Sequence, residues 1–86
     1  MNRYVIRSTT RNKQEFYLAK SNGKYRWTED EDDEDIVFIT TAKRAEFERY
    51  IIDREEIFVT VKTEEDIDYI DFLRVSDSYV ARTYHR

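Results

Sequence analysis

Apolar and polar residues alternate on both sides of Asn22-Gly23, along Glu15 to Lys20 and again along Lys24 to Thr28. Alternation with a period of two is typical of a β-strand, because successive side chains point to opposite faces. Asn and Gly both tolerate the positive φ angles that a type I′ turn requires. The pattern therefore predicts a β-hairpin whose arms meet at this dipeptide.

A second alternating run, from Tyr4 to Ser8, precedes the hairpin. We expect it to add a third antiparallel strand, joined to the hairpin by a turn at Arg11-Asn12-Lys13. The stretch from Ile57 to Lys62 also alternates and is rich in β-branched residues, which predicts another strand.

A helical pattern of apolar residues occupies the middle of the chain. Thr40 or Thr41 is a suitable N-cap for a helix that runs to about Asp53. Its apolar stripe consists of Phe47, Tyr50 and Ile51.

A second helical pattern begins at Thr63-Glu64-Glu65-Asp66, which resembles a capping box with Asp in place of the usual Glu. Ile67, Ile70 and Leu73 follow at helical spacing. These residues predict a short helix over residues 63–73.

The tail from Val75 to Tyr84 carries turn-forming residues at Ser76-Asp77-Ser78, which predicts one or two strands around them. Together these elements predict an α+β fold, with a small antiparallel sheet built on the N-terminal hairpin and meander and two short helices at about 41–53 and 63–73. At 86 residues, we expect one compact domain over residues 1–86. Such a chain buries about 60–65% of the surface that its unfolded form exposes, so its core is modest.

The composition narrows the possible cellular location of the protein and the kinds of site that it can contain. The chain has no cysteine, which excludes disulfides and thiolate metal sites. Its longest apolar run, Ile36 to Ile39, is far shorter than the roughly 20 residues of a membrane helix. The N-terminus also lacks the apolar stretch of a signal peptide. We therefore expect a soluble cytoplasmic protein with no membrane partner.

Charge is segregated along the chain. Residues 1–28 carry seven Lys or Arg and one acid, whereas residues 29–71 carry seventeen acids and five bases. These segments have charges of about +6 and about −12, although the net charge of the chain is only −4. Charge segregation of this kind concerns association with partners more than it concerns the fold.

Residues suited to catalysis are scarce. The only histidine, His85, is the penultimate residue, where chain ends fray, so it is a poor general base. The spacing of Asp30, Asp32 and Glu34 loosely resembles a calcium loop, but the turn glycine and the twelfth-position Glu are missing. With a single glycine, the chain has no glycine-rich phosphate loop. We expect no enzymatic activity, no metal and no cofactor.

Seven consecutive acids occupy residues 29–35. If this segment is extended, Glu29, Glu31, Asp33 and Asp35 form a row with a spacing of about 7 Å. Duplex DNA presents one phosphate charge per about 1.7 Å of its axis, so one such row reproduces only part of the charge density of DNA.

The predicted helix over residues 63–73 supplies a second acidic row. Glu64, Asp68 and Asp71 share one helical face, with Glu65 beside them. Two acidic rows on one small domain are suited to the Lys and Arg of a DNA-binding groove. Binding of this kind weakens steeply as the salt concentration rises.

Two plainer interpretations apply to the same acids. Acidic runs are commonly solvated surfaces that keep a protein in solution. The basic hairpin can also neutralise the acidic segment within the molecule, through Lys20, Lys24 and Arg26, although exposed ion pairs stabilise a fold little.

The basic N-terminal third, which contains aromatic residues, suggests the reverse activity, direct binding of nucleic acid. Exposed aromatics such as Tyr25 and Trp27 can stack on bases while nearby cations contact phosphates. However, so small a chain needs its aromatics in the core, and the acidic segment repels nucleic acid. We therefore expect no direct binding of nucleic acid.

The stretch from Asn22 to Thr28, followed by acids, by Val37 to Thr40 and by a helix with Ala45 and Phe47, resembles small acidic host-takeover proteins of bacteriophages. The resemblance covers about residues 15–52 and concerns a layout, not a diagnostic motif. Several such proteins are DNA mimics that block HU-like nucleoid proteins or other DNA-binding host proteins. The modest net charge departs from strong mimics, which implies an acidic patch instead of a fully acidic surface.

The resulting hypothesis is a non-enzymatic inhibitor whose acidic patch mimics DNA and occupies the DNA-binding surface of a basic host protein. Its candidate partner-binding residues are Glu29, Asp30, Glu31, Asp32, Asp33, Glu34, Asp35, Glu64, Glu65, Asp68 and Asp71. The alternative is a protein–protein adaptor or scaffold that docks through the hairpin aromatics Tyr25 and Trp27. Exposure of Trp27 distinguishes the two, because an adaptor needs it at the surface.

Overall fold

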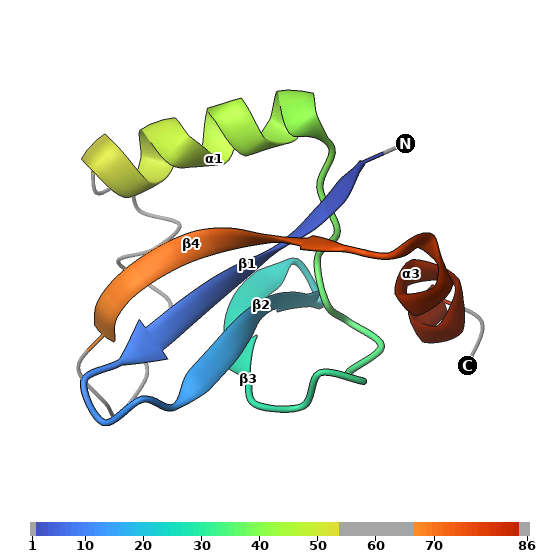
Figure 1. Cartoon of the computed structure of the whole chain (residues 1–86), viewed down its shortest axis with the longest axis horizontal. Helices are drawn as coiled ribbons and strands as arrows, with labels where there is room; N and C mark the ends of the chain where they lie inside the picture. Colours follow the sequence, from blue (N-terminus) through green and yellow to red (C-terminus); the bar gives the residue numbers. More distant parts are fainter. Residues whose placement is uncertain (1, 54–66, 85–86) are drawn as a thin grey trace.

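The computed structural model describes residues 2–53 and 67–84, and within them it shows four strands and two helices. The strands form an antiparallel sheet in the order β3-β2-β1-β4. Helix α1 lies over the sheet, and helix α3 follows β4 directly at the far end of that strand (Figure 1). The α+β class predicted from the sequence is confirmed.

The predicted hairpin consists of β2 (Glu15–Ser21) and β3 (Lys24–Thr28). Asn22 and Gly23 have φ angles of +52° and +77°, as a type I′ turn requires, so this prediction is confirmed. Gly23 adopts this conformation without the steric cost that a Cβ atom would add.

The predicted third strand is also present, as β1 (Arg3–Thr10). Three of its residues, from Arg7 to Thr9, pair with residues 15–17 of β2. The connecting turn lies at the predicted residues 11–13, where Lys13 has a φ of +72°. The N-terminal meander is therefore confirmed, with β1 in the middle of the sheet.

Strand β4 (Ile67–Val75) corrects the prediction of a helix over residues 63–73. It pairs with β1 along nearly its whole length. Residues 63–66, the expected start of that helix, lie outside the described residues. The long ladder with β1 satisfies the backbone of residues 67–73 and outweighs their helical spacing.

Helix α3 (Asp77–Tyr84) corrects the prediction of strands in the tail. The Oγ atom of Ser76 accepts a hydrogen bond from the backbone N of Tyr79 at 3.1 Å, which is an N-cap contact. Ser and Asp favour turns and N-caps for the same reason, because their side chains bond nearby backbone groups. The strand predicted over residues 57–62 lies outside the described residues.

Residues 36–39, here called the wedge segment, lie between β1 and β2 where those strands no longer pair. The backbone N of Val37 donates to the carbonyl oxygen of Leu18 in β2 at 3.0 Å. The backbone groups of Ile39 and Tyr4 in β1 exchange two hydrogen bonds of 2.9 Å. Each end of the wedge segment is therefore attached to a different strand.

Helix α1 (Thr41–Asp53) has the predicted bounds. The Oγ1 atom of Thr40 accepts a hydrogen bond from the backbone N of Lys43 at 3.3 Å, which confirms Thr40 as the N-cap. Phe47 is buried beneath the helix, whereas the side chains of Tyr50 and Ile51 are outside the described part of the structure.

The core lies between α1 and the sheet. Its buried cluster consists of Ile6, Leu18, Ile39 and Phe47. Partly buried residues surround this cluster, namely Tyr4, Tyr25, Trp27, Val37, Ile70 and Phe72. Because side chains alternate along each strand, Val5 and its cross-strand neighbour Leu73 lie on the opposite face, here called the far face of the sheet.

Candidate functional site

The acidic loop, residues 29–35, connects β3 to the wedge segment through a series of turns. The backbone N of Asp30 donates to Thr28 Oγ1 at 3.1 Å, and the backbone N of Asp32 donates to Asp30 Oδ1 at 2.9 Å. The backbone N of Asp35 donates to Asp33 Oδ1, also at 2.9 Å. Bonds between an Asp side chain and the backbone two residues later form Asx turns, so the loop owes its shape to its own aspartates.

These turns contradict the extended row expected for Glu29, Glu31, Asp33 and Asp35. An extended segment would place the four carboxylates on one face at regular intervals. In the structure, Asp33 and Asp35 instead point toward β3 and bind Arg26. The prediction of a regular row is therefore wrong, and only part of the acidic loop faces solvent.

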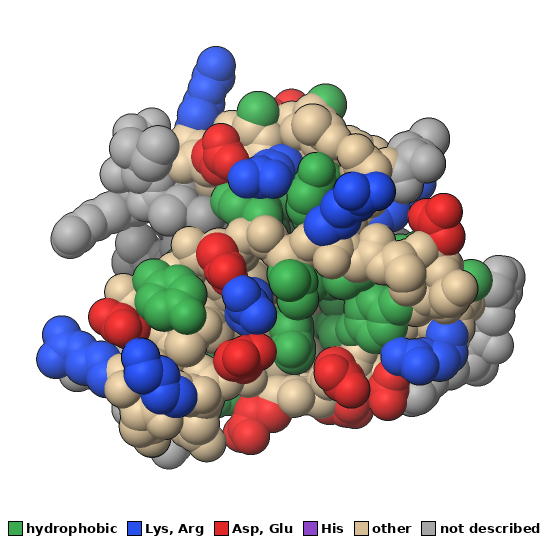
Figure 2. Space-filling view, in the orientation of Figure 1, with side chains coloured by type: hydrophobic (Ala, Val, Ile, Leu, Met, Phe, Trp, Pro, Cys, Tyr) green, Lys and Arg blue, Asp and Glu red, His purple; other side chains and the backbone are tan. Residues whose placement is uncertain are grey.

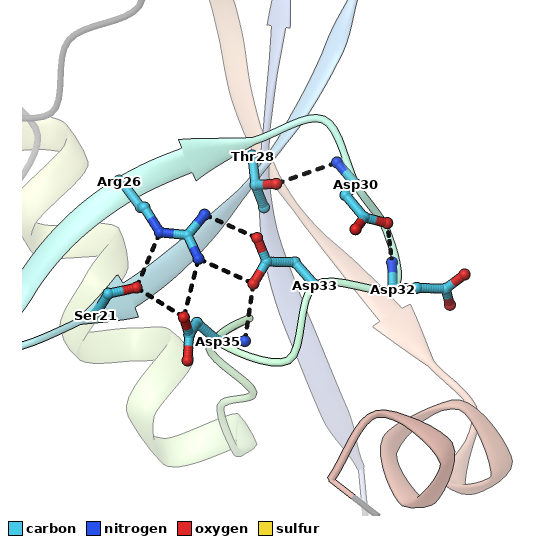
Figure 3. A network of polar contacts seen from close by, with 7 residues as sticks. All are labelled: Ser21, Arg26, Thr28, Asp30, Asp32, Asp33 and Asp35. Atoms are coloured by element: carbon cyan, nitrogen blue, oxygen red, sulfur yellow. Dashed lines mark hydrogen bonds and ion pairs between the residues drawn. The ribbon is translucent and has the colours of Figure 1, made fainter. Parts of the chain in front are cut away.

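The guanidinium of Arg26 is the centre of this arrangement (Figure 3). Its two terminal nitrogens donate to the two carboxylate oxygens of Asp33 at 2.8 and 2.9 Å. One of them also donates to Asp35 Oδ2 at 3.0 Å, and Nε donates to Ser21 Oγ at 2.9 Å. Ser21 Oγ in turn donates to Asp35 at 2.8 Å. We call these four residues the Arg26 clamp.

The clamp changes the titration of its members. Hydrogen bonds from Arg26 are the main reason that the pKa of Asp33 is lowered to about 2, although partial burial opposes the shift. The same contact, chiefly with Asp33, raises the pKa of Arg26. Such bidentate arginine–carboxylate pairs fix geometry as well as charge. The intramolecular neutralisation considered from the sequence therefore occurs at Arg26.

Helix α3 holds the other end of the acidic loop. The Tyr79 hydroxyl donates a hydrogen bond to the backbone carbonyl oxygen of Glu31. Arg82 lies with one terminal nitrogen 3.3 Å from Asp32 Oδ1, and the rings of Tyr79 and Phe38 meet edge to face at 5.7 Å. The loop is therefore attached to β3, to the wedge segment and to α3.

Four exposed acids remain on the outer side of the acidic loop. We call them the outer carboxylates: Glu29, Asp30, Glu31 and Glu34. Within the described part of the chain, none of the four forms an ion pair. Figure 2 shows acidic side chains along the lower edge of one face of the molecule, where Figure 1 places this loop, next to a central group of apolar side chains.

The second acidic row expected from the sequence is not formed as predicted. Asp68 and Asp71 lie on β4, not on a helix, and the register of β4 with β1 shifts at Asp68, so the two carboxylates do not form the row of a helical face. Asp68 is exposed, whereas Asp71 accepts two hydrogen bonds from Arg7, one of them from Nε at 3.0 Å. Glu64 and Glu65 lie outside the described residues.

The Arg7 guanidinium sits between two acids on the far face. The hydrogen bonds to Asp71 are the main cause of the raised pKa of Arg7. On the other side, Arg7 Nη1 lies 3.5 Å from Glu15 Oε2. Cross-strand pairing of β1 with β2 and β4 brings these three side chains together, as the register shows. Asp71 is therefore a structural partner of Arg7 more than a free surface charge.

A groove that the sequence did not reveal lies on the far face, beside the acidic loop. It has a volume of about 200 Å³. Its lining residues are Val5, Tyr17, Leu73, Val75, Ser76, Tyr79 and Glu31. Leu73 and Val75 alternate with Arg74, and this pattern could have indicated a strand with an apolar face at the groove. The prediction of a helix over residues 63–73 prevented that interpretation.

The hairpin aromatics serve the core. Tyr25 and Trp27 are partly buried and pack against the hydrophobic cluster under α1. Lys20 stands over the Tyr25 ring with its Nζ atom 5.0 Å from the ring centroid. This placement matches the expectation that the aromatics are core residues, and it weakens both docking and base stacking through them.

The described residues contain no group of three His, Cys, Asp or Glu side chains positioned to hold a metal ion. Neither described helix has the length and apolar character needed to cross a membrane. Comparisons of this chain with protein-family models, with curated proteins and with solved structures found no match.

Proposed function

We propose that this protein is a non-enzymatic inhibitor whose outer carboxylates bind the DNA-binding surface of a basic protein in place of DNA. The proposal depends on one observation: some acids of the acidic loop hold its backbone in place, whereas others are exposed to solvent. The Arg26 clamp and α3 fix the backbone, and four carboxylates face solvent on that fixed backbone. A preformed charge array loses little conformational entropy on binding.

Charge supports the same proposal. Segregated acids steer a basic partner toward one side of the molecule, where they can take the place of DNA phosphates beside the partner's Lys and Arg. The surface involved is a patch, because Asp33, Asp35 and Asp71 are already occupied by arginines of the same chain. An HU-like protein is a suitable representative of the partner class, in line with the host-takeover role that the resemblance implies.

The test is displacement of a labelled DNA duplex from an HU-like protein, followed by fluorescence anisotropy at increasing salt. Wild-type protein should release the duplex at low salt and progressively lose this ability as salt rises. A neutral outer variant, Glu29→Gln with Asp30→Asn and Glu34→Gln, should bind about tenfold more weakly, since each exposed charge pair contributes roughly 0.5 kcal/mol.

The matched control removes the same charge elsewhere. It combines Glu46→Gln on α1, Asp68→Asn on β4 and Asp77→Asn on α3, all exposed acids outside the acidic loop; Asp68 qualifies because the second acidic row to which the sequence assigned it is not formed. This variant should displace DNA as well as the wild-type protein does. Equal weakening by the two triple variants would mean that net charge alone acts, and failure of the wild-type protein to displace the duplex at low salt would contradict the proposal.

A further inference from the structure

The groove on the far face lies directly beside one of the outer carboxylates. Its apolar part is formed by Val5, Leu73 and Val75, and its polar part by Glu31 and two tyrosines. The volume of about 200 Å³ is below the roughly 300–1,000 Å³ of pockets for small molecules. It suits a single long side chain of a macromolecular partner better than a metabolite.

We propose that the groove receives one arginine side chain of the basic partner, with its guanidinium against Tyr17 and Tyr79 and paired with Glu31. This inference rests on the proposed function, because it specifies how the acidic loop and its surroundings would recognise a basic surface. The methylene groups of the arginine would cover Val5 and Leu73, as long cationic side chains commonly cover apolar surface.

The protein already contains a contact of the proposed kind. The Arg82 guanidinium lies 5.3 Å from the centroid of the Tyr79 ring and 3.3 Å from a carboxylate oxygen of Asp32. A guanidinium is planar, stacks on aromatic rings and pairs with carboxylates, whereas an ammonium acts as a compact point charge. The combination of tyrosine rings and a carboxylate therefore favours arginine over lysine.

The charges around the groove also favour a cation. Burial is the main cause of the raised pKa of both Tyr17 and Tyr79, and the charge of Glu31 contributes to each shift. Among the described residues, two cations oppose this effect: the charge of Arg7 lowers the pKa of Tyr17, and the charge of Arg82, beside the Tyr79 ring, lowers the pKa of Tyr79. Arg7 is already held by Asp71 and Glu15, and Arg82 is paired with Asp32, so much of their repulsion is offset.

The test is an NMR titration of the full chain with two capped peptides of equal charge, hexa-arginine and hexa-lysine. Hexa-arginine should bind about fivefold more tightly and should shift the ring resonances of Tyr17 and Tyr79. Glu31→Gln should weaken hexa-arginine binding about fivefold and remove its advantage over hexa-lysine. Glu34→Gln, which removes the same charge from the acidic loop outside the groove, should weaken both peptides equally and by about twofold at most.

Glu31→Gln keeps the backbone carbonyl that Tyr79 binds, so its amide spectrum should remain that of the folded protein. Equal affinity for the two peptides, with shifts confined to the acidic loop, would overturn the arginine groove and leave the acidic patch in place. Absence of binding by either peptide at low salt would overturn both proposals.

Discussion

The inner and outer sides of the acidic loop consist of the same residue types, yet they have different roles. On the inner side, Asp33 keeps only 15% of its side chain exposed and forms two hydrogen bonds with Arg26. On the outer side, Glu29 and Glu34 are exposed and make no ion pair with other described residues. The difference shows that an acidic run is not a uniform surface, because one arginine fixed on a neighbouring strand divides it into a structural part and an available part.

The largest expected effect on stability comes from removing Arg26, the arginine that separates the inner from the outer side of the acidic loop. Arg26→Ala leaves the partly buried Asp33 without its cation, which should lower the free energy of unfolding by about 2 kcal/mol. Urea denaturation followed by Trp27 fluorescence measures this change. Lys24→Ala, which removes an exposed cation from the same strand, is the matched control and should change stability by less than about 0.5 kcal/mol. Equal stability of the two variants would show that the Arg26 clamp contributes nothing to the fold.

A smaller effect should appear at acidic pH. Because the pKa of Asp33 is lowered from 3.8 to about 2, its ionised form is stabilised by folding. This contribution is complete above about pH 5 and is lost as the pH falls through the folded-state pKa of about 2. Its size should be on the order of 1 kcal/mol, since Arg26 is 40% exposed and water screens the pair.

Urea denaturation at several pH values between 5 and 2 measures this loss. Asp33→Asn has no carboxyl group to titrate there, so its stability should fall less over the same range than that of the wild-type protein. Parallel curves for the two proteins would show that the inner carboxylate has an ordinary titration and that the comparison between the two sides fails.

The smallest effect on stability is expected on the outer side. The neutral outer variant, Glu29→Gln with Asp30→Asn and Glu34→Gln, should keep its free energy of unfolding within about 0.5 kcal/mol of the wild-type value. Asp30→Asn retains the side-chain oxygen that accepts the hydrogen bond from Asp32. A loss above about 1 kcal/mol would mean that the outer carboxylates also support the fold.

Local sequence patterns were sufficient to predict the elements that are stabilised by residues close to them in the sequence. The hairpin follows from Asn22-Gly23, and α1 follows from Thr40 and the position of Phe47. Both depend on contacts within a few residues, which alternation and capping rules describe.

Long-range pairing explains the failure at residues 67–73. Ile70 and Phe72 pack toward α1, whereas Leu73 and Val75 line the groove on the far face, so apolar residues occur on both sides of β4. A strand with two apolar faces does not alternate, and its spacing can match a helix. Only the pairing with β1 resolves the ambiguity.

The candidate site was predictable in composition but not in geometry. The sequence identified the acidic loop and included Arg26 among the bases that can neutralise it. It did not indicate which acids face inward, because that depends on the Asx turns at Asp30 and Asp33 and on the position of β3. The groove was missed because it needs β1, β2, β4 and α3 together.

The pairing of β1 with β4 also has a consequence for biosynthesis. β1 is synthesised before β4, and the hairpin, the acidic loop and α1 lie between them in the chain, so β1 lacks its β4 neighbour until those segments have been made. Contacts between such distant segments slow folding, because the chain between them must be ordered first. We therefore expect the sheet to be completed only after the hairpin and the acidic loop have been synthesised.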